Sequence, residues 1–239
     1  MRPARWEQGA PRCPGLAEID TRMTPRRIGN AAGALALASA ASIAFLDVRI
    51  ARGVARLPAG LRGFFRTGTQ LLDVITGKDL SNSTLALVLI LASLGVWTFP
   101  SQRRTARVLM LVALSNLLAH FVVSVLKPVF GRLRPYQIEE TGWVDQFFAD
   151  GRSFPSGHTA FYFGLCLPLA WAVPRWRIPV LLPALFVAAA RVLVNDHFAG
   201  DVLGSLAITA GVNACLIAAF QRYAKLEQAG PPRATAPGG

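Results

Sequence analysis

Apolar residues along this chain of 239 residues are gathered into long runs, and the charged residues fall mostly between the runs. Each run is close to the length of about 20 residues that a helix needs to cross the hydrocarbon of a bilayer. Small residues recur inside the runs, where they allow helices to pack closely in lipid. A soluble helical protein would show amphipathic stripes instead. The pattern predicts an all-α integral membrane bundle of six transmembrane helices, at roughly residues 28–46, 82–99, 106–126, 156–174, 178–194 and 201–220.

The runs define one membrane domain over residues 28–222. Tails at 1–27 and 223–239 contain proline, glycine and arginine without periodicity, and we expect them to be disordered. Met1 and Met23 are alternative translation starts. The three cysteines follow no metal-binding or disulfide spacing.

The net charge of +12 raises the question of a nucleic-acid partner. The cations are spread over every connection instead of forming one patch, so no nucleic acid is predicted and the bilayer is the expected partner. Alternate connections carry most of them, and the positive-inside rule assigns those connections and both termini to the cytoplasm. They are the six arginines before residue 28, together with Arg103, Arg104, Arg107, Arg175, Arg177, Arg222, Lys225 and Arg233.

The basic connection 47–81 is an exception, because it should lie on the outer side. Arginines within 49–66 share one helical face and aliphatic residues share another. This spacing predicts an amphipathic segment on the outer leaflet, broken near Pro58 and Gly60. A solvated basic loop is the alternative.

Three clusters of polar residues stand at the ends of the apolar runs. The first runs from Lys127 to Pro135, and Pro128 predicts that the third span ends at Lys127. Taken alone, Lys127, Arg132 and Arg134 could be anchors that snorkel to the membrane surface.

The second cluster, Pro155-Ser156-Gly157-His158, directly precedes an apolar helix. Ser156 is a natural N-cap and Gly157 permits close backbone approach. The free amides of that helix end would bind an anion, with His158 in the first turn facing it.

The third cluster contains Arg191, His197 and Asp201. A carboxylate four residues after a histidine meets it on one helical face, fixes its tautomer and leaves the other ring nitrogen free to attack. A purely structural His–Asp cap is the alternative. Arg191 ends an apolar run, where a cation is costly unless it is paired or functional. Six alternating spans put all three clusters on one face, which predicts a single site that binds and attacks a phosphate.

These clusters resemble the signature of the type 2 phosphatidic acid phosphatases, or lipid phosphate phosphatases, which share an active site with vanadium haloperoxidases. The matches are Lys127 with Arg134-Pro135, then Pro155 to His158, then Arg191, His197 and Asp201. Ala190 departs from the serine usual in the family. The haloperoxidases are soluble, which disfavours that branch.

The resemblance implies that His197 is the nucleophile, Asp201 orients it, and His158 protonates the leaving group and later activates water. It also implies phosphate binding without a metal or other cofactor, at Lys127, Arg134, Ser156, Gly157 and Arg191. The expected location is a bacterial inner membrane with the site on the periplasmic face.

The substrate stays open among phosphatidate, phosphatidylglycerophosphate, an isoprenoid diphosphate and lipid A. A lipid phosphotransferase and a non-enzymatic transporter of anionic lipids are the alternative functions, and the sequence does not fix the oligomeric state. Trp143, Phe147 and Phe148 lie on the connection 136–154, either at the lipid interface near the site or in ordinary loop packing.

Overall fold

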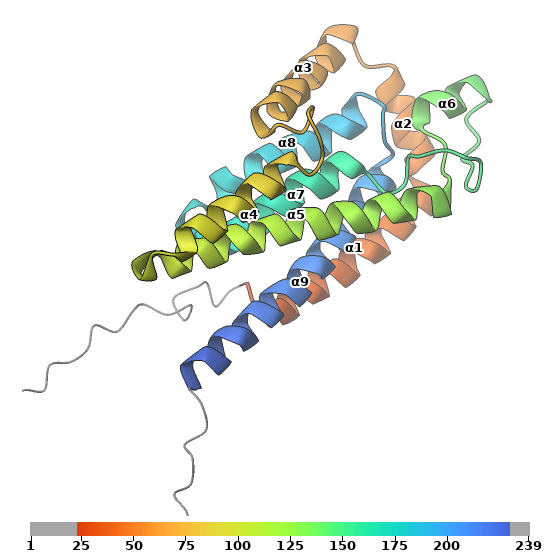
Figure 1. Ribbon diagram of the computed structural model, residues 1–239. Coiled ribbons are helices and arrows are strands. Elements are labelled where there is room, and N and C mark those ends of the chain that lie inside the picture. Colours follow the sequence, from red (N-terminus) through yellow and green to blue (C-terminus); the bar gives the residue numbers. More distant parts are fainter. Residues whose placement is uncertain (1–22, 230–239) are drawn as a thin grey trace, which may run out of the picture.

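A computed structural model describes residues 23–229, and these residues form helices joined by turns, without a strand (Figure 1). The all-α prediction is confirmed. Of the tails predicted at 1–27 and 223–239, residues 1–22 and 230–239 lie outside the described residues. Residues 25–27 begin the first helix and residues 223–229 continue the last one, so the expectation of disorder is wrong there. The helices are α1 (Pro25–Phe45), α2 (Asp47–Ala55), α3 (Ala59–Thr76), α4 (Thr84–Trp97), α5 (Arg103–Phe130), α6 (Pro135–Glu140), α7 (Gly157–Ala172), α8 (Arg177–Leu193) and α9 (Ala199–Ala229), with short 3-10 turns at Pro100–Gln102 and Pro174–Trp176.

Each of the six predicted spans is a helix, namely α1, α4, α5, α7, α8 and α9. Within the described part of the chain, four segments are long and apolar enough to cross a membrane: Pro25–Phe45, Pro100–Glu140, Pro174–Leu193 and Ala199–Ala224. The 14 residues of α4 and the 16 residues of α7 fall short of the usual crossing length. The structure therefore confirms the membrane character of the helices but not the count of six spans.

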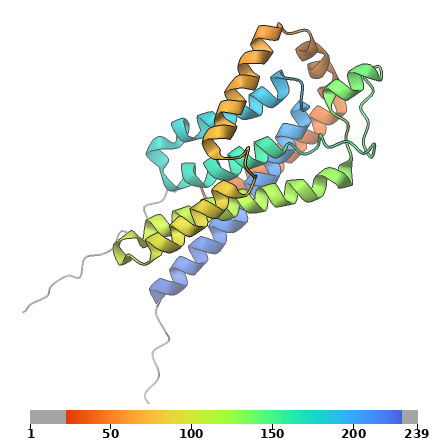
Figure 2. The same cartoon turned by 45° about the horizontal axis from the view of Figure 1, so that its top comes forward.

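The centre of the bundle is α7, which packs against α5, α8 and α9. Its side chains from Thr159 to Phe163 are buried, including the large rings of Phe161 and Tyr162. The helices α1 and α9 lie side by side along their length, and α4 lies along α5 (Figures 1 and 2). This packing fixes the two ends of α7, and its N-terminal end carries the second cluster.

The predicted end of the third span at Lys127 is wrong. Helix α5 continues through Pro128 to Phe130 and stops at Gly131, which adopts the left-handed conformation with φ of 51°. A proline removes one backbone donor and disfavours helical geometry in the residue before it. Here the helix nevertheless continues for three residues beyond Lys127, from Pro128 to Phe130. Glycine then ends the helix because it reaches positive φ without steric cost.

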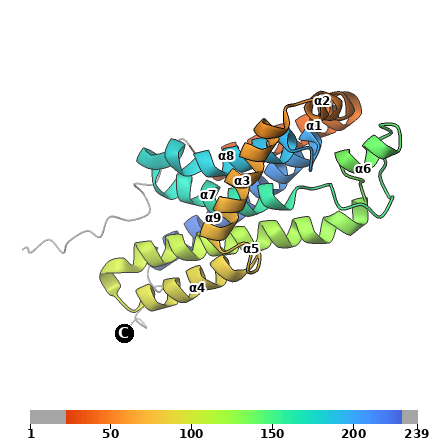
Figure 3. The ribbon, with the colours of Figure 1, turned by 90° about the horizontal axis from the view of Figure 1, so that it is seen from above.

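The amphipathic segment predicted for 49–66 forms two helices, α2 and α3, with the break at Pro58 as expected. Gly60 instead lies inside α3. On the outside of the bundle α3 lies over α8 (Figure 3). The ring of Phe65 stacks on Phe186 of α8 with centroids 5.4 Å apart. A side chain at Gly68 would meet the Phe186 ring at 2.6 Å, so this contact needs glycine.

Candidate active site

His197 lies in the tight turn between α8 and α9, and its side chain is 2% exposed. Its backbone N–H donates to the carbonyl of Arg191 at 3.0 Å, which holds the turn against the end of α8. The ring nitrogen Nδ1 lies 3.4 Å from Asp201 Oδ2 and 3.5 Å from Ser153 Oγ. Among the described residues both side-chain contacts of the imidazole use Nδ1, so Nε2 is left for a ligand.

Asp201, in the first turn of α9, is held from several directions. Its Oδ1 accepts from Arg132 Nη1 at 2.7 Å, and its Oδ2 accepts from Ser153 Oγ and from the backbone N–H of Phe198. Asp201 is wholly buried. A carboxylate with this many donors cannot rotate freely, so it fixes the orientation of the His197 ring.

Arg132 is the residue that sequence reasoning underrated. Its side chain is 0% exposed and pairs with Asp47, Asp145 and Asp201, which lie in separate parts of the chain. Its guanidinium also lies over the ring of Phe198, 4.0 Å from the centroid. A snorkelling anchor would reach solvent, so that alternative is wrong for Arg132.

The environment of His197 keeps its imidazole neutral. Burial lowers the pKa of His197 to about 4; the hydrogen bond and charge of Asp201 raise it, and the charges of Lys127 and Arg191 lower it. A neutral ring whose Nδ1–H faces Asp201 carries its lone pair on Nε2. That lone pair is therefore unprotonated at neutral pH.

Lys127 and Arg191 lie beside this histidine. The ammonium of Lys127, in the last turn of α5, donates to the carbonyl of Arg152 at 2.7 Å. Arg191, in the last turn of α8, pairs with Asp196 at 2.8 Å, while its buried Nε has no hydrogen-bond partner among the described residues. A buried donor without a partner costs free energy, and an anion at this position would satisfy it.

Arg134 stands at the N-cap of α6, where its backbone N–H donates to Gln137 Oε1 at 2.8 Å. Its charge lies close enough to Lys127 and Arg191 to interact with both. Three mutually repelling cations held together by the fold create a strong preference for an anion among them.

Ser156 and Gly157 begin α7 next to these cations. Ser156 occupies the N-cap position of α7 as predicted, but its buried Oγ accepts a hydrogen bond from Thr159 Oγ1 and makes no capping bond to the helix backbone. A side chain at Gly157 would stand 3.6 Å from Lys127 Cε, which places this helix end against the Lys127 side chain. The amides of a first helical turn lack intrahelical partners and favour an anion.

His158 has a partner that the sequence did not reveal. Its Nε2 lies 3.1 Å from Oδ2 of Asp73 on α3, and Oδ1 of Asp73 accepts from the hydroxyl of Tyr162 at 2.7 Å. Burial raises the pKa of Asp73. The hydrogen bond and charge of His158, together with Tyr162 and Lys78, lower it by more, so the net pKa lies below the usual range. Asp73 is therefore a carboxylate in this structure.

The structure brings the predicted residues to one end of the bundle. They come from the end of α5, the start of α6, the start of α7, the end of α8 and the start of α9, which meet beneath α2 and α3 (Figure 1). The charge of Arg191 acts on both histidines. No hydrogen bond joins His158 to His197 among the described residues.

The aromatic residues of the connection 136–154 divide between the two alternatives. Phe148 is 80% exposed, as expected for a ring at the lipid interface. Phe147 packs inward, with its ring 4.8 Å from the Arg132 guanidinium, and Trp143 lies under Arg52.

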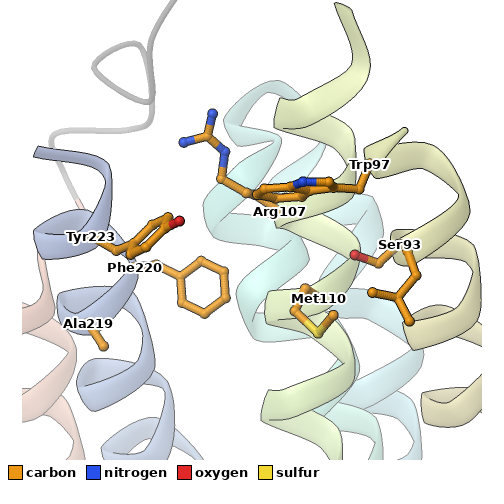
Figure 4. A pocket seen from close by; sticks show the side chains of 8 residues that line it. Ser93, Trp97, Arg107, Met110, Ala219, Phe220 and Tyr223 are labelled. Atoms are coloured by element: carbon orange, nitrogen blue, oxygen red, sulfur yellow. The ribbon is translucent and has the colours of Figure 1, made fainter. Parts of the chain in front are cut away.

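A separate apolar pocket lies between α4, α5 and α9, at the end of the bundle away from the histidines (Figure 4). Its volume is about 360 Å³, and Trp97, Phe220 and Tyr223 line it with Arg107 and Met110. The lining contains neither histidine nor carboxylate, so the chemistry belongs to the other end.

Comparisons with known proteins bear on the family. Residues 108–225 match the model of the PAP2 superfamily. Over 124 residues the chain is 30% identical to a lipid A 1-phosphatase of Rhizobium johnstonii, covering 50% of this chain and 49% of the relative. Over 100 residues it is 32% identical to a lipid A 1-phosphatase of Rhizobium etli, covering 40% and 41%. The chain thus spans at most about half the length of these relatives, and no solved structure matches it.

The matched region contains all three clusters, from Lys127 to Asp201, in the order and spacing of the family signature. The region that contains these clusters, residues 108–225, matches the PAP2 superfamily, the type 2 phosphatidic acid phosphatases.

Proposed function

We propose that this protein is an integral membrane phosphatase that removes a phosphate from a membrane lipid through a phosphohistidine on His197. One observation carries the proposal: Asp201 holds the buried imidazole through Nδ1, while Nε2 has no hydrogen-bond partner in residues 23–229 and lies within range of the charges of Lys127 and Arg191. Phosphoryl transfer requires mainly positioning and charge stabilisation, which this arrangement supplies.

In the first step, Nε2 of His197 forms a bond to phosphorus as the bond from phosphorus to the lipid oxygen breaks. The electron pair leaves with the lipid oxygen, which takes a proton from His158. Asp201 stabilises the positive charge that develops on the His197 ring, and Arg132 keeps Asp201 in place. Removal of a proton donor of this kind typically costs about 10²–10⁴-fold in rate.

In the second step, His158 accepts a proton from water as the water oxygen bonds to phosphorus. The bond from phosphorus to Nε2 breaks, and its electron pair returns to His197. Phosphate is released, and the enzyme regains its starting protonation.

The phosphate oxygens would be held by cations and by the start of α7. Lys127, Arg134 and Arg191 supply charge, and the unpartnered Nε of Arg191 supplies a donor. The Ser156 hydroxyl and the Gly157 amide would complete the set. Because these groups contact only the phosphoryl group, they do not select the lipid.

We place the site on the periplasmic face of a bacterial inner membrane, with both termini in the cytoplasm. Arg103, Arg104, Arg175 and Arg177 stand at the other end of the bundle from the histidines, which supports this orientation. A reporter fused to the C-terminus tests it, since periplasmic activity of that reporter contradicts the assignment.

A lipid A-type glycolipid phosphate is the first substrate to test, because both curated relatives carry the name lipid A 1-phosphatase. The panel also contains phosphatidate, phosphatidylglycerophosphate and undecaprenyl diphosphate. Purified protein in detergent is assayed for free phosphate.

Three histidine variants make the assay decisive. We expect His197→Gln to abolish phosphate release and His158→Ala to reduce it by about 10²-fold or more. His120→Ala is the matched control, because this third histidine contacts Ser124 on α5 and belongs to neither cluster. Full activity of His197→Gln contradicts the proposal, and phosphate found on a lipid acceptor instead of in solution indicates a phosphotransferase.

A further inference from the structure

We propose that Asp73 is a positioning residue for the acid–base histidine, His158, although it lies outside all three sequence clusters. The inference rests on the proposed function. It adds a second histidine–carboxylate pair, contributed by the surface helix α3, to the pair formed by His197 and Asp201.

The contact is specific on both sides. Asp73 Oδ2 lies 3.1 Å from His158 Nε2, and Asp73 Oδ1 accepts from the Tyr162 hydroxyl at 2.7 Å. The Tyr162 oxygen in turn lies 3.3 Å from Thr76 Oγ1, one turn further along α3. Both carboxylate oxygens are therefore used, so the position of the carboxylate is fixed against α7.

The fold delivers Asp73 to this place from the inner face of α3. The neighbours Leu71, Val74 and Ile75 are 60–69% exposed, whereas Asp73 is 6% exposed. The close contact of Gly68 with Phe186 holds the same helix against α8. Burying a carboxylate is costly unless it is paired, and the partner here is a histidine that the mechanism uses.

The pairing decides which ring nitrogen of His158 does the chemistry. With the Nε2–H donating to Asp73, the other nitrogen, Nδ1, is left to face the substrate. Nδ1 makes no hydrogen bond to any of the described residues. In the protonated ring, Nδ1–H is the proton donor to the leaving lipid oxygen. After transfer, the lone pair on Nδ1 accepts the proton from water.

The two carboxylates are suited to different tasks. Asp201 forms a direct ion pair with Arg132, which fixes the carboxylate that orients the His197 ring. Asp73 makes no ion pair with an arginine among the described contacts, although Lys78 and Arg191 lie within range of its charge. It therefore retains its charge to stabilise the His158 imidazolium, the form that an acid requires.

Leaving-group dependence tests this role. An acid is needed when the leaving group is an alkoxide and is not needed for p-nitrophenolate. We compare Asp73→Asn with wild type over the first turnover, using the best phosphomonoester lipid of the panel, which has an alkoxide leaving group, and p-nitrophenyl phosphate. The side chains are isosteric, but the amide can donate to Nε2 and hold the wrong tautomer. The first turnover of the lipid is expected to slow by about 10- to 100-fold, and the p-nitrophenolate burst is expected to stay near wild type.

Two further variants keep the test sharp. Tyr162→Phe removes one support of Asp73 and leaves its charge, so we expect the same selectivity with a smaller loss. Asp79→Asn is the matched control, because it removes an exposed carboxylate from the adjacent connection and touches neither histidine. Wild-type rates on both substrates are expected for it.

The outcomes separate this inference from the proposed function. If His158→Ala shows the selective loss and Asp73→Asn does not, the positioning role of Asp73 is overturned and the function stands. Equal loss of both substrates in Asp73→Asn also overturns it, because that result indicates a structural role. If His158→Ala itself shows no selectivity, the proposed acid fails.

Discussion

Replacing Arg132 by methionine tests the structure beneath the site. The side chain is fully buried, and its guanidinium makes four hydrogen bonds to Asp47, Asp145 and Asp201. Methionine fills similar space without charge, so it leaves three carboxylates facing one another. Two of them, Asp47 and Asp201, are completely buried.

The magnitude follows from the loss of a buried partner. Removing one member of a buried ion pair costs about 3–5 kcal/mol, because the remaining charge stays buried without compensation. For a domain of this size, 1 kcal/mol corresponds to roughly 2–4 °C in melting temperature. We therefore expect Arg132→Met to melt roughly 6–20 °C below the wild type. Phosphatase activity should also fall, since Asp201 loses one of its donors.

Thermal unfolding of the purified protein in detergent, with phosphate release on the same samples, measures both effects. Arg104→Met is the matched control, because this arginine is exposed at the start of α5, at the far end of the bundle from Arg132. Arg132→Lys should recover only part of the loss, since an ammonium cannot reproduce the planar fork that contacts three carboxylates. If Arg132→Met has the same melting temperature as Arg104→Met and keeps its activity, the role given to Arg132 is refuted.

Two further predictions concern titration and packing. The pKa of His197 in the folded protein, about 4, lies below the value of about 6.5 expected on unfolding, so the folded state binds fewer protons between these values. The free energy of unfolding should rise with pH through that window by up to roughly 3 kcal/mol, and the full contribution of His197 should be present above it. Melting curves from pH 4.5 to 7.5 should show a weaker pH dependence in His197→Gln than in the wild type. An identical dependence contradicts the burial argument. Gly164→Ala should destabilise the protein by about 1–3 kcal/mol, because the added carbon would lie 2.9 Å from the Asn116 backbone of α5. Gly211→Ala meets nothing within 4 Å and should melt at or above wild type, and equal melting of the two variants is the result that sinks this reasoning.

Long apolar runs allowed the sequence to predict the helices, because hydrophobic segments in this length range have few alternatives to a helix. The signature residues were also accessible to sequence reasoning. His197 and Asp201 meet as the spacing predicted, although His197 lies in the turn before α9 and not on a shared helical face. The end of α5 was misjudged because a proline shifts a local preference without dictating where a helix stops. Gly131 decided that point through its positive φ.

The supporting residues could not be predicted in the same way. Arg132 and Asp47 are 85 residues apart, as are His158 and Asp73, and no periodic pattern links such positions. Each of these contacts depends on how α2 and α3 fold back over the helix ends. The available signal for Arg132 was its position inside the first cluster, between Lys127 and Arg134. Asp73 had none, because it lies on a helix whose other features indicate a membrane surface.

Trapping the phosphorylated enzyme tests the central claim most directly. Wild-type protein is mixed with the preferred lipid phosphate, quenched within the first turnover under alkaline conditions that preserve phosphohistidine, and digested for mass spectrometry. We predict one phosphate on His197, absent from His197→Gln and longer-lived in His158→Ala, where water is not activated. Turnover of the wild type without any phosphate on His197, or a phosphopeptide that persists in His197→Gln, would contradict the account.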